Sequence, residues 1–392
     1  MKYEIFWKNP RYKIRKELKK DIRCDYLIVG GGVTGVSLAY FLSKHKAGKI
    51  VLIEKEHIAS GATGKAAGTL VTRGESDLSD IIKKYGRKKG VEYWLEVKNS
   101  LNDIRNIIFK EKIDCDVEIQ DTLYCGYKNN NYNNLYKEYD LEKSIEKATR
   151  FLCRNDLIKE LNTKLFDYAI LSRNHGISLD PLKFTQNLSK VVEKMGVKIY
   201  ENTSLIRFSK NIAETYHGDI TFKKIILAID SFNPNEKVKN LKSTVIVTNP
   251  LKKSQIIKIG FMSKKGIFNK KIVWDSRKNY NYFKLTKDNR LLVGFGGIIV
   301  HKRHRKIDPH FPHLKNMEVF IKKLFPYLKL KVDYVWSETF GVSDDFDPIV
   351  EFKKNSIEIS GAGTQVACFM ASKYVSERIL GKKSSLTKFF KG

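Results

Sequence analysis

The stretch from Asp25 to Gly35, DYLIVGGGVTG, limits the fold of this chain more than any other part of the sequence. It begins with an apolar run of strand length and continues, after three glycines, with apolar residues at helical spacing. Gly30, Gly32 and Gly35 follow the spacing GxGxxG. Such glycines permit a tight turn, a close approach of the backbone to a pyrophosphate, and close packing of the helix on the strand. The phosphates would lie at the helix N-terminus, where free N–H groups and the helix dipole favour anions.

A second apolar strand is expected at residues 49–54 and ends in Glu54. This acid lies 24 residues after Gly30, near the roughly 20 residues expected when a carboxylate binds the ribose hydroxyls of a dinucleotide. Glycine-rich turns also occur where nothing binds, so the alternative is a βαβ unit with a charged strand end and no phosphate. The combination of strand, turn, helix and acid favours a bound dinucleotide.

The length of 392 residues suits two packed domains. Period-two strands between residues 241 and 331 predict an antiparallel sheet, whereas the patterns before and after them continue the first βαβ unit. We therefore predict an α/β fold, with a discontinuous Rossmann-type nucleotide domain and an antiparallel-sheet substrate domain. The predicted ranges are 1–23 for an N-terminal arm, 24–76, 150–237 and 335–392 for the nucleotide domain, and 77–149 and 238–334 for the substrate domain.

Five cysteines are scattered along the chain without a CxxC pair or a metal-ligand spacing. This usage indicates a reducing compartment, so we expect a cytoplasmic protein. The uncharged run at residues 26–43 has the length of a membrane span or a signal peptide, but three consecutive glycines suit a lipid-facing helix poorly and no cleavage site follows. We expect no transmembrane segment.

The formal net charge of +30 raises nucleic acid or an anionic membrane surface as partners. The lysines are spread over the whole chain, together with many Asn and Ile residues, and form no single stripe. We therefore interpret the charge as a solvated basic surface, and a nucleic-acid partner stays open as the less favoured alternative. The histidines His301, His304, His310 and His313 lie close together in a segment rich in Lys and Arg. Because cations repel a metal ion, we expect an exposed loop there and no metal site.

Motifs along the chain resemble the FAD-dependent amine and amino-acid oxidoreductases of the D-amino-acid oxidase and glycine oxidase type. In chain order they are GxGxxG with Glu54, SGATG at 60–64, LDP at 179–181, the stretch 336–348 and GAG at 361–363. Within this family the chain is most similar to the branch that contains gamma-glutamylputrescine oxidoreductase. The segments that indicate this branch are WDSR at 274–277, YFKLT at 282–286, DNR at 288–290 and LFP at 324–326. The resemblance covers almost the whole chain beyond Arg23 and implies a flavoprotein oxidoreductase.

The resemblance also implies which residues bind FAD. The glycine-rich turn would hold the pyrophosphate, Glu54 the adenosine ribose, and Leu205 the adenine. The segment 61–68 would line the isoalloxazine, and residues 361–364 would give N–H donors to the pyrimidine edge of the flavin. The implied cofactor-binding residues are Gly30, Gly32, Val33, Thr34, Gly35, Glu54, Lys55, Gly61, Ala62, Thr63, Lys65, Ala67, Gly68, Leu205, Gly361, Gly363 and Thr364.

Departures from the family pattern carry information. Relatives with covalent flavin place a His where this chain has Lys65, or a Cys near the C-terminal stretch, and no Cys lies between Cys153 and Cys368. We therefore expect non-covalent FAD. Relatives also often have Gly where this chain has Asp230, and a glycine that follows Pro348-Ile in relatives is replaced by Val350-Glu351.

Amino-acid oxidases of this type carry an Arg in the stretch that corresponds to residues 339–341, where it binds the substrate carboxylate in a bidentate manner. This chain has Phe340 there. The resemblance thus favours an amine, or an N-substituted amine with a distant carboxylate, over a simple amino acid. Arg277 or Arg290 stays open as a substitute.

The expected reaction is the transfer of a hydride from the carbon that bears a neutral amine to flavin N5, after which the imine hydrolyses. Oxygen or a redox partner would then accept the electrons. No dedicated base is required if the amine enters deprotonated. Tyr282 and Lys284 are the candidate catalytic residues, and the alternative is that they are ordinary strand residues. Two other functions stay open, a flavoenzyme that acts on a modified tRNA base and a non-catalytic FAD-binding subunit.

Overall fold

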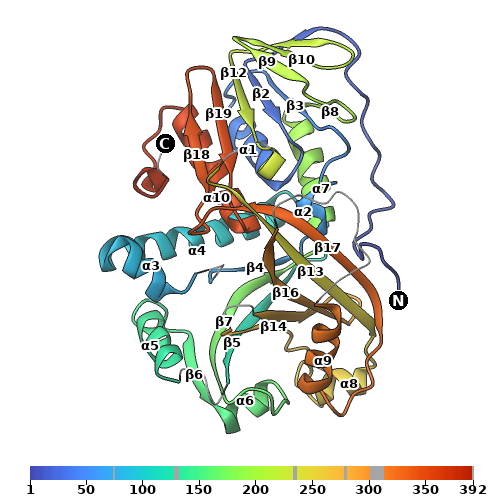
Figure 1. The fold of residues 1–392 in the computed structure, drawn as a ribbon, viewed down its shortest axis with the longest axis vertical. Helices are drawn as coiled ribbons and strands as arrows, with labels where there is room; N and C mark the ends of the chain where they lie inside the picture. Colours follow the sequence, from blue (N-terminus) through green and yellow to red (C-terminus); the bar gives the residue numbers. More distant parts are fainter. Residues whose placement is uncertain (74–75, 128–131, 233–235, 278–279, 301–312, 391–392) are drawn as a thin grey trace.

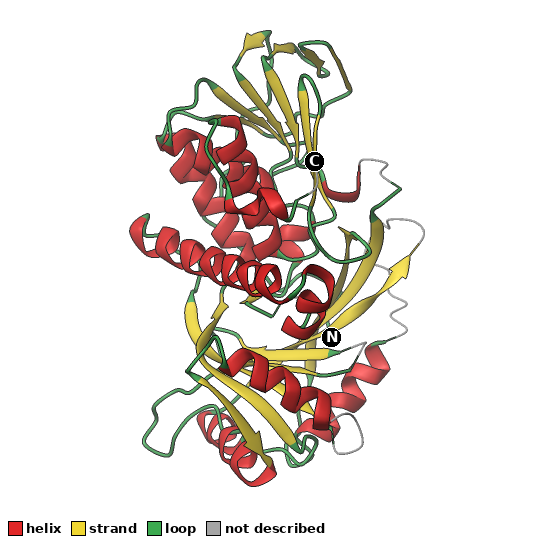
Figure 2. Cartoon of the chain, turned by 90° about the vertical axis from the view of Figure 1, so that its left-hand side faces the viewer, coloured by secondary structure: helices red, strands yellow, loops and turns green. Residues whose placement is uncertain are grey.

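The structure is a computed structural model, and it describes all residues except 74–75, 128–131, 233–235, 278–279, 301–312 and 391–392. Two large β-sheets occupy opposite halves of the molecule, and helices gather beside one of them and between the two (Figures 1 and 2). The histidines predicted to form an exposed loop, His301, His304 and His310, lie outside the described residues.

The first large sheet has six strands in the order β18-β19-β12-β2-β3-β8. All its neighbours pair in parallel except β18 and β19, which are antiparallel. All four residues of β3 are buried, as expected when both faces of a parallel sheet are covered. Its strands are β2 (Tyr26–Val29), β3 (Ile50–Ile53), β8 (Lys198–Tyr200), β12 (Lys224–Leu227), β18 (Ile349–Phe352) and β19 (Ser356–Ser360).

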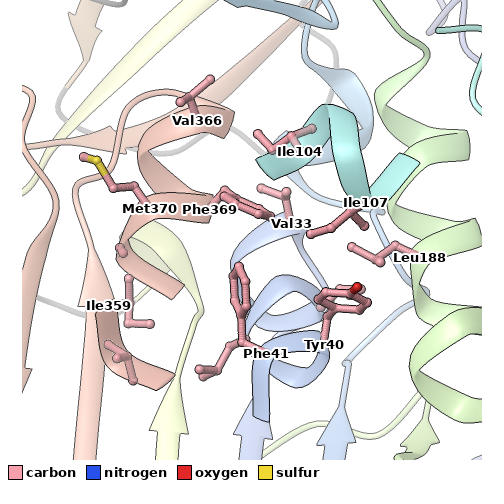
Figure 3. Close-up of a cluster of buried hydrophobic side chains, with 14 of the residues drawn as sticks. Val33, Tyr40, Phe41, Ile104, Ile107, Leu188, Ile359, Val366, Phe369 and Met370 are labelled. Atoms are coloured by element: carbon pink, nitrogen blue, oxygen red, sulfur yellow. The ribbon is translucent and has the colours of Figure 1, made fainter. Parts of the chain in front are cut away.

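Helix α1 (Val33–Lys44) is the centre of the larger apolar core. It packs against α10 (Gln365–Ile379) and α7 (Pro181–Lys194), and Figure 3 shows side chains of these helices together with Ile104 and Ile107 of α4 (Arg87–Lys110) around it. The rings of Phe41 and Phe369 meet edge to face, with centroids 5.0 Å apart. This packing fixes α1 relative to α10.

The second large sheet has the order β17-β13-β16-β15-β14-β5-β7-β4, with β6 paired to β7. Only β14 and β5 pair in parallel among these strands, so the predicted antiparallel sheet is present. Its strands are β4 (Thr69–Val71), β5 (Glu118–Gly126), β6 (Thr149–Cys153), β7 (Tyr168–Ser178), β13 (Lys239–Pro250), β14 (Lys271–Asp275), β15 (Asn281–Leu285), β16 (Arg290–Val300) and β17 (Val332–Val342).

The predicted domain ranges remain a prediction. Several strands from the ranges given to the nucleotide domain pair in this second sheet. These strands are β4, β7 and most of β6 and β17. A small third sheet was not expected. It joins β1 (Ile22–Arg23) to β9 (Arg207–Ser209), β10 (Ile212–Glu214) and β11 (Asp219–Thr221).

Most of the remaining helices lie around the nine-stranded sheet, whereas the short helix at residues 62–65 lies between the two large sheets (Figure 1). In the described part of the chain, no helix has both the length and the apolar character needed to cross a membrane. The remaining helices are α2 (Ala62–Lys65), α3 (Leu78–Tyr85), α5 (Tyr132–Lys143), α6 (Arg154–Glu160), α8 (Lys253–Lys258) and α9 (Leu314–Leu324). The short 3₁₀ turns are Asp230–Phe232 and Ser385–Lys388.

Candidate active site

A cavity of about 640 Å³ is lined by both large sheets. The six-stranded sheet contributes strand ends such as Val29 and Ile53, and the nine-stranded sheet contributes Ile272, Trp274 and Tyr282. Every residue predicted to bind the cofactor lines this cavity except Gly35. Residues from five distant segments of the chain are thus brought to one place.

The glycine-rich turn has the geometry that its spacing predicts. Gly30 has φ +112°, and a Cβ there would lie 2.3 Å from Ala228 O of the strand beside it. A Cβ on Gly35 would lie 2.0 Å from Gly30 O, so Gly35 lets the helix pack on the turn and does not face the cavity. Gly32 faces the hydroxyl of Thr63, which accepts the N–H of Val33 at 3.0 Å.

The first turn of α1 suits an anion. Its N-cap residue, Gly32, has no side chain that could cap the helix, and no acid lies in the first turn. Of the first N–H groups, that of Val33 donates to the Thr63 hydroxyl. The N–H groups at this helix end and the positive end of the dipole therefore point to a ligand of negative charge in the cavity.

Glu54 is buried at the end of β3. Its carboxylate accepts the N–H of Gly31 at 2.7 Å and that of Glu56 at 3.0 Å. Burial raises the pKa of Glu54, and the two N–H groups partly oppose this shift. The carboxylate lines the cavity and has further lone pairs for hydroxyl donors.

The turn at residues 361–364 lines the cavity with two glycines in the left-handed region, Gly361 at φ +65° and Gly363 at φ +59°. The N–H of Gly363 donates to Gly341 O at 3.3 Å, and that of Thr364 donates to Ala362 O at 2.5 Å. These two N–H groups have protein acceptors in this structure, and their expected role as donors to the flavin stays a prediction.

Of the two candidate catalytic residues, one lines the cavity and the other does not. Tyr282 lines the cavity, and its ring lies over Gly294 of the next strand, where a Cβ would come within 1.9 Å of it. Lys284 lies behind the cavity wall, fully buried, and its ammonium donates to Gly68 O at 2.5 Å and to Leu179 O at 3.5 Å. Lys284 therefore binds a segment that lines the cavity, but the Lys284 side chain itself does not line the cavity.

Burial lowers the pKa of Lys284 to about 7, although the carboxylates of Glu118 and Asp180 partly oppose the shift. An unfolded lysine has a pKa of about 10.4, so between these values the unfolded chain binds more protons and the lysine makes the free energy of unfolding rise with pH. We expect this free energy to rise with pH more steeply in the natural protein than in Lys284→Met, by up to about 1.4 kcal/mol per pH unit. Denaturant titrations at pH 7, 8 and 9 with saturating FAD measure the difference.

Lys264→Met is the matched control, because Lys264 is exposed. It should follow the pH dependence of the natural protein. Equal pH slopes for the natural protein and Lys284→Met would show that Lys284 stays charged in the folded state.

The substrate side of the cavity contains a buried ion cluster that the sequence did not predict. Nη1 of Arg73 lies 2.7 Å from Asp77 Oδ1 and 3.2 Å from Glu138 Oε1, and Nη2 bonds to Glu142. The Arg73 guanidinium also lies 4.2 Å from the ring centroid of Tyr124. We call these four charged side chains the Arg73 cluster.

Charge and burial compete in the Arg73 cluster. Burial would lower the pKa of Arg73, but the carboxylates of Glu142, Asp77 and Glu138 together raise it above its usual value. Burial raises the pKa of Glu142 to about 7 despite the adjacent guanidinium. Arg73 lines the cavity, whereas its three carboxylate partners do not, so the cluster reaches the cavity through the Arg73 side chain alone.

The two arginines proposed as substitutes for the missing carboxylate-binding Arg do not line the cavity. Arg277 Nη2 lies 2.5 Å from Asp275 Oδ2, and Arg290 Nη1 lies 2.8 Å from Asp333 Oδ2. Phe340 does line the cavity, as the sequence comparison predicted for this position. The substitute hypothesis is therefore not supported by the positions of these side chains.

The other departures from the family pattern have structural explanations. Asp230 has φ +56°, the conformation that favours the Gly of the relatives, and its Oδ1 accepts the N–H of Gly341 at 2.8 Å. Val350 and Glu351 lie in β18 and do not line the cavity. Cys368 lines it, but burial raises the pKa of this thiol to about 12.

These features fit FAD. The glycine cradle leaves no room for a Cβ at Gly30, the N-cap of α1 has no capping side chain, and the buried carboxylate of Glu54 lines the cavity. Segment 61–68 and several aromatic side chains line the same cavity. Among the described residues, no group of three or more His, Cys, Asp or Glu side chains has a metal-binding arrangement.

The comparisons with known proteins point in the same direction. A family model described as "FAD dependent oxidoreductase" matches residues 25–377. The chain is 27% identical over 337 residues to gamma-glutamylputrescine oxidoreductase of Escherichia coli (strain K12), which covers 82% of this chain and 75% of that protein. It is 26% identical over 211 residues to YhfW of Bacillus subtilis (strain 168), whose name describes a Rieske 2Fe-2S iron-sulfur protein. That match covers 53% of this chain and only 40% of the relative.

A solved structure has a similar fold. The crystal structure of glycine oxidase from Geobacillus kaustophilus matches with a TM-score of 0.76 and 16% identity, over 94% of this chain and 98% of that chain. At this identity the match concerns the fold alone.

Proposed function

Because the chain belongs to the family of FAD-dependent oxidoreductases, we propose that it oxidises the C–N bond of an amine, or of an N-substituted amine whose carboxylate is far from the reacting carbon. Its cofactor is FAD, and its relatives include oxidoreductases of amines and amino acids. When bound, FAD supplies a hydride acceptor at N5, and an imine product then hydrolyses. The protein's part is to bind, orient and shield the amine.

The observation that carries this proposal is that Arg73 already forms ion pairs with three carboxylates. Arg73 is the cation on the substrate side that an α-carboxylate would need. A fourth carboxylate would have to displace one of them from a buried site, which leaves that carboxylate without its partner. A simple α-amino acid therefore lacks its main anchor in this cavity.

The other cations among the described lining residues give no better anchor. Lys65 forms an ion pair with Glu338, and the Lys55 ammonium lies 3.6 Å from the ring centroid of Phe232, next to the residues expected at the adenosine end. The substrate side is lined instead by aromatic side chains, namely Trp274, Tyr280, Tyr282 and Phe340. Aromatic faces favour an amine that carries positive charge elsewhere in the molecule.

We assign Tyr282 to contact with the substrate, since it lines the cavity from the antiparallel sheet. Lys284 acts as a positioning residue, because its ammonium bonds to the carbonyl of Gly68 behind the wall. No base is assigned, and the amine enters neutral. We further propose that FAD is bound non-covalently, since Lys65 is paired and the Cys368 thiol is held protonated.

We propose a cytoplasmic location from the five cysteines, all of which are free thiols. The electron acceptor is oxygen or a redox partner, and admission of air to the reduced protein separates these two. The two alternatives, a tRNA-directed flavoenzyme and a non-catalytic subunit, both predict that no free amine bleaches the flavin in the experiment below.

The test is anaerobic mixing of the holoprotein with a panel of substrates, followed by flavin absorbance. We expect bleaching by primary or N-alkyl amines, with a reduction rate at equal concentration at least about tenfold above that for glycine or D-alanine, because the charge of one unpaired carboxylate costs more than the ~1.4 kcal/mol that a factor of ten represents. Faster bleaching by simple amino acids would contradict the proposed substrate class. Bleaching by no amine at all would favour one of the two alternatives.

A further inference from the structure

Three buried side chains bind carbonyls of the loop 65–68 from one side. Residues 65–68 all line the cavity, whereas none of the three donors does. The hydrogen bonds run from Trp336 Nε1 to Lys65 O at 2.7 Å, from Trp7 Nε1 to Ala66 O at 2.8 Å and from Lys284 Nζ to Gly68 O at 2.5 Å. Three of the four carbonyls of the loop therefore accept a hydrogen bond from a side chain that does not line the cavity.

The donors also set the direction of the N–H groups. A trans peptide directs its C=O and its N–H to opposite sides. Because Ala66 O faces the Trp7 indole, the N–H of Ala67 points away from Trp7, toward the side of the loop that lines the cavity. A rotation of this peptide would exchange an N–H donor for a carbonyl acceptor at the cavity wall.

Trp7 comes from the N-terminal arm, which the family model does not cover, since its match begins at residue 25. Figure 1 shows the arm as the blue segment that runs along one side of the molecule. Trp7 is only 8% exposed and packs in an apolar cluster with Ala67, Val245 and Trp336. Its position therefore depends on how the arm is held.

The arm is attached on both sides of Trp7. Before it, the N–H of Lys2 donates to Asp333 O at 2.6 Å and Lys2 O accepts from Val335, at β17. After it, Asn9 Nδ2 donates to Gln186 Oε1 at 2.9 Å, on α7. The arm thus connects the nine-stranded sheet to a helix of the other half and places Trp7 between them.

We propose that Trp7 is a positioning residue of the flavin site, and that the N-terminal arm exists in this chain partly to hold the loop 65–68 in the conformation that binds the isoalloxazine. Loss of the indole N–H removes the donor to Ala66 O at a half-buried position, and the loop can then turn this carbonyl toward the cofactor. FAD binding weakens, and the flavin environment changes.

The test compares two Trp→Phe variants of the full-length protein. In Trp7→Phe we expect the FAD dissociation constant to rise about tenfold, as for one carbonyl that loses its donor, together with a shift of the visible flavin spectrum. Trp94→Phe is the matched control, because Trp94 is buried to a similar degree and its Nε1 donates to no atom in the part of the chain that the structure describes. It should leave both quantities within twofold of the natural protein.

A second variant covers the case in which Trp7→Phe does not fold. Incorporation of 3-benzothienylalanine at position 7 keeps the shape of the ring and replaces the N–H by sulfur, so it removes the donor alone. The same loss of FAD affinity is expected. An FAD affinity and a flavin spectrum that stay unchanged in the folded variants would overturn the proposal. These readouts need no substrate, so they are independent of the proposed amine oxidation.

Discussion

Replacement of Gly30 by alanine is expected to give a colourless protein. The backbone at Gly30 has φ +112°, and a Cβ would lie 2.3 Å from Ala228 O. Ala228 directly follows β12, and its N–H donates to Val29 O at 2.8 Å, so this carbonyl cannot move away without disturbing the sheet. The strain displaces the turn that cradles the phosphates. We expect the FAD content after desalting, measured as the ratio of flavin absorbance to protein absorbance, to fall by at least about tenfold. A loss of ~1.4 kcal/mol in the binding free energy of FAD suffices for this factor.

Gly61→Ala is the control for this experiment. Gly61 lines the same cavity, but a Cβ there meets nothing within 4 Å and its φ is −80°. This variant adds the same methyl group to the cavity wall without backbone strain, so it should retain more FAD than Gly30→Ala. A yellow Gly30→Ala protein with the flavin content of the natural protein would show that the turn does not carry the cofactor.

Replacement of Arg73 by methionine is expected to lower the free energy of unfolding by about 3–5 kcal/mol at pH 8, the range seen when one partner of a buried ion pair is removed. Methionine fills much of the volume but leaves the carboxylates of Asp77, Glu138 and Glu142 without their cation. In the variant, burial and mutual repulsion raise the pKa values of these acids in the folded state. The folded protein then binds more protons than the unfolded chain, so the variant gains stability as the pH falls.

Urea titrations at pH 8 and pH 5.5 test both parts of this prediction, and the loss at pH 5.5 should be the smaller one. Arg207→Met is the control, because Arg207 and Glu214 form an exposed pair at the surface, and no measurable change is expected there. A loss at pH 8 no larger than that of the control would mean that the Arg73 cluster is solvated. Glu142→Gln should cost less than Arg73→Met, since it leaves two carboxylates on the guanidinium.

The nucleotide half of the site could be predicted from the sequence because local rules determine it. Glycine spacing, strand composition and the position of Glu54 are all properties of about 30 consecutive residues. The family resemblance supplied the more distant segments, and sixteen residues named from it line one cavity. Tertiary packing was not needed to find them.

The substrate half could not be predicted in the same way. Arg73 is an isolated arginine after a short strand, and its partners Glu138 and Glu142 lie on a helix more than 60 residues later, at a spacing typical of any solvated helix face. Strand β7 was also not predicted, although it has 11 residues, because its middle contains Arg173, Asn174 and His175, which break the apolar pattern. Trp7 gave no signal in a polar, basic arm.

The attachment of the arm also has a consequence for the order of assembly during synthesis. Residues 2 and 7 leave the ribosome first, but their partners at 333, 335 and 336 are made near the end of synthesis, and β19 of the parallel sheet is made later still. Contacts of such long sequence separation form slowly, because the chain between them must first be closed into a loop. The prosthetic group is therefore captured after translation of nearly the entire polypeptide, and truncated translation products should emerge without colour.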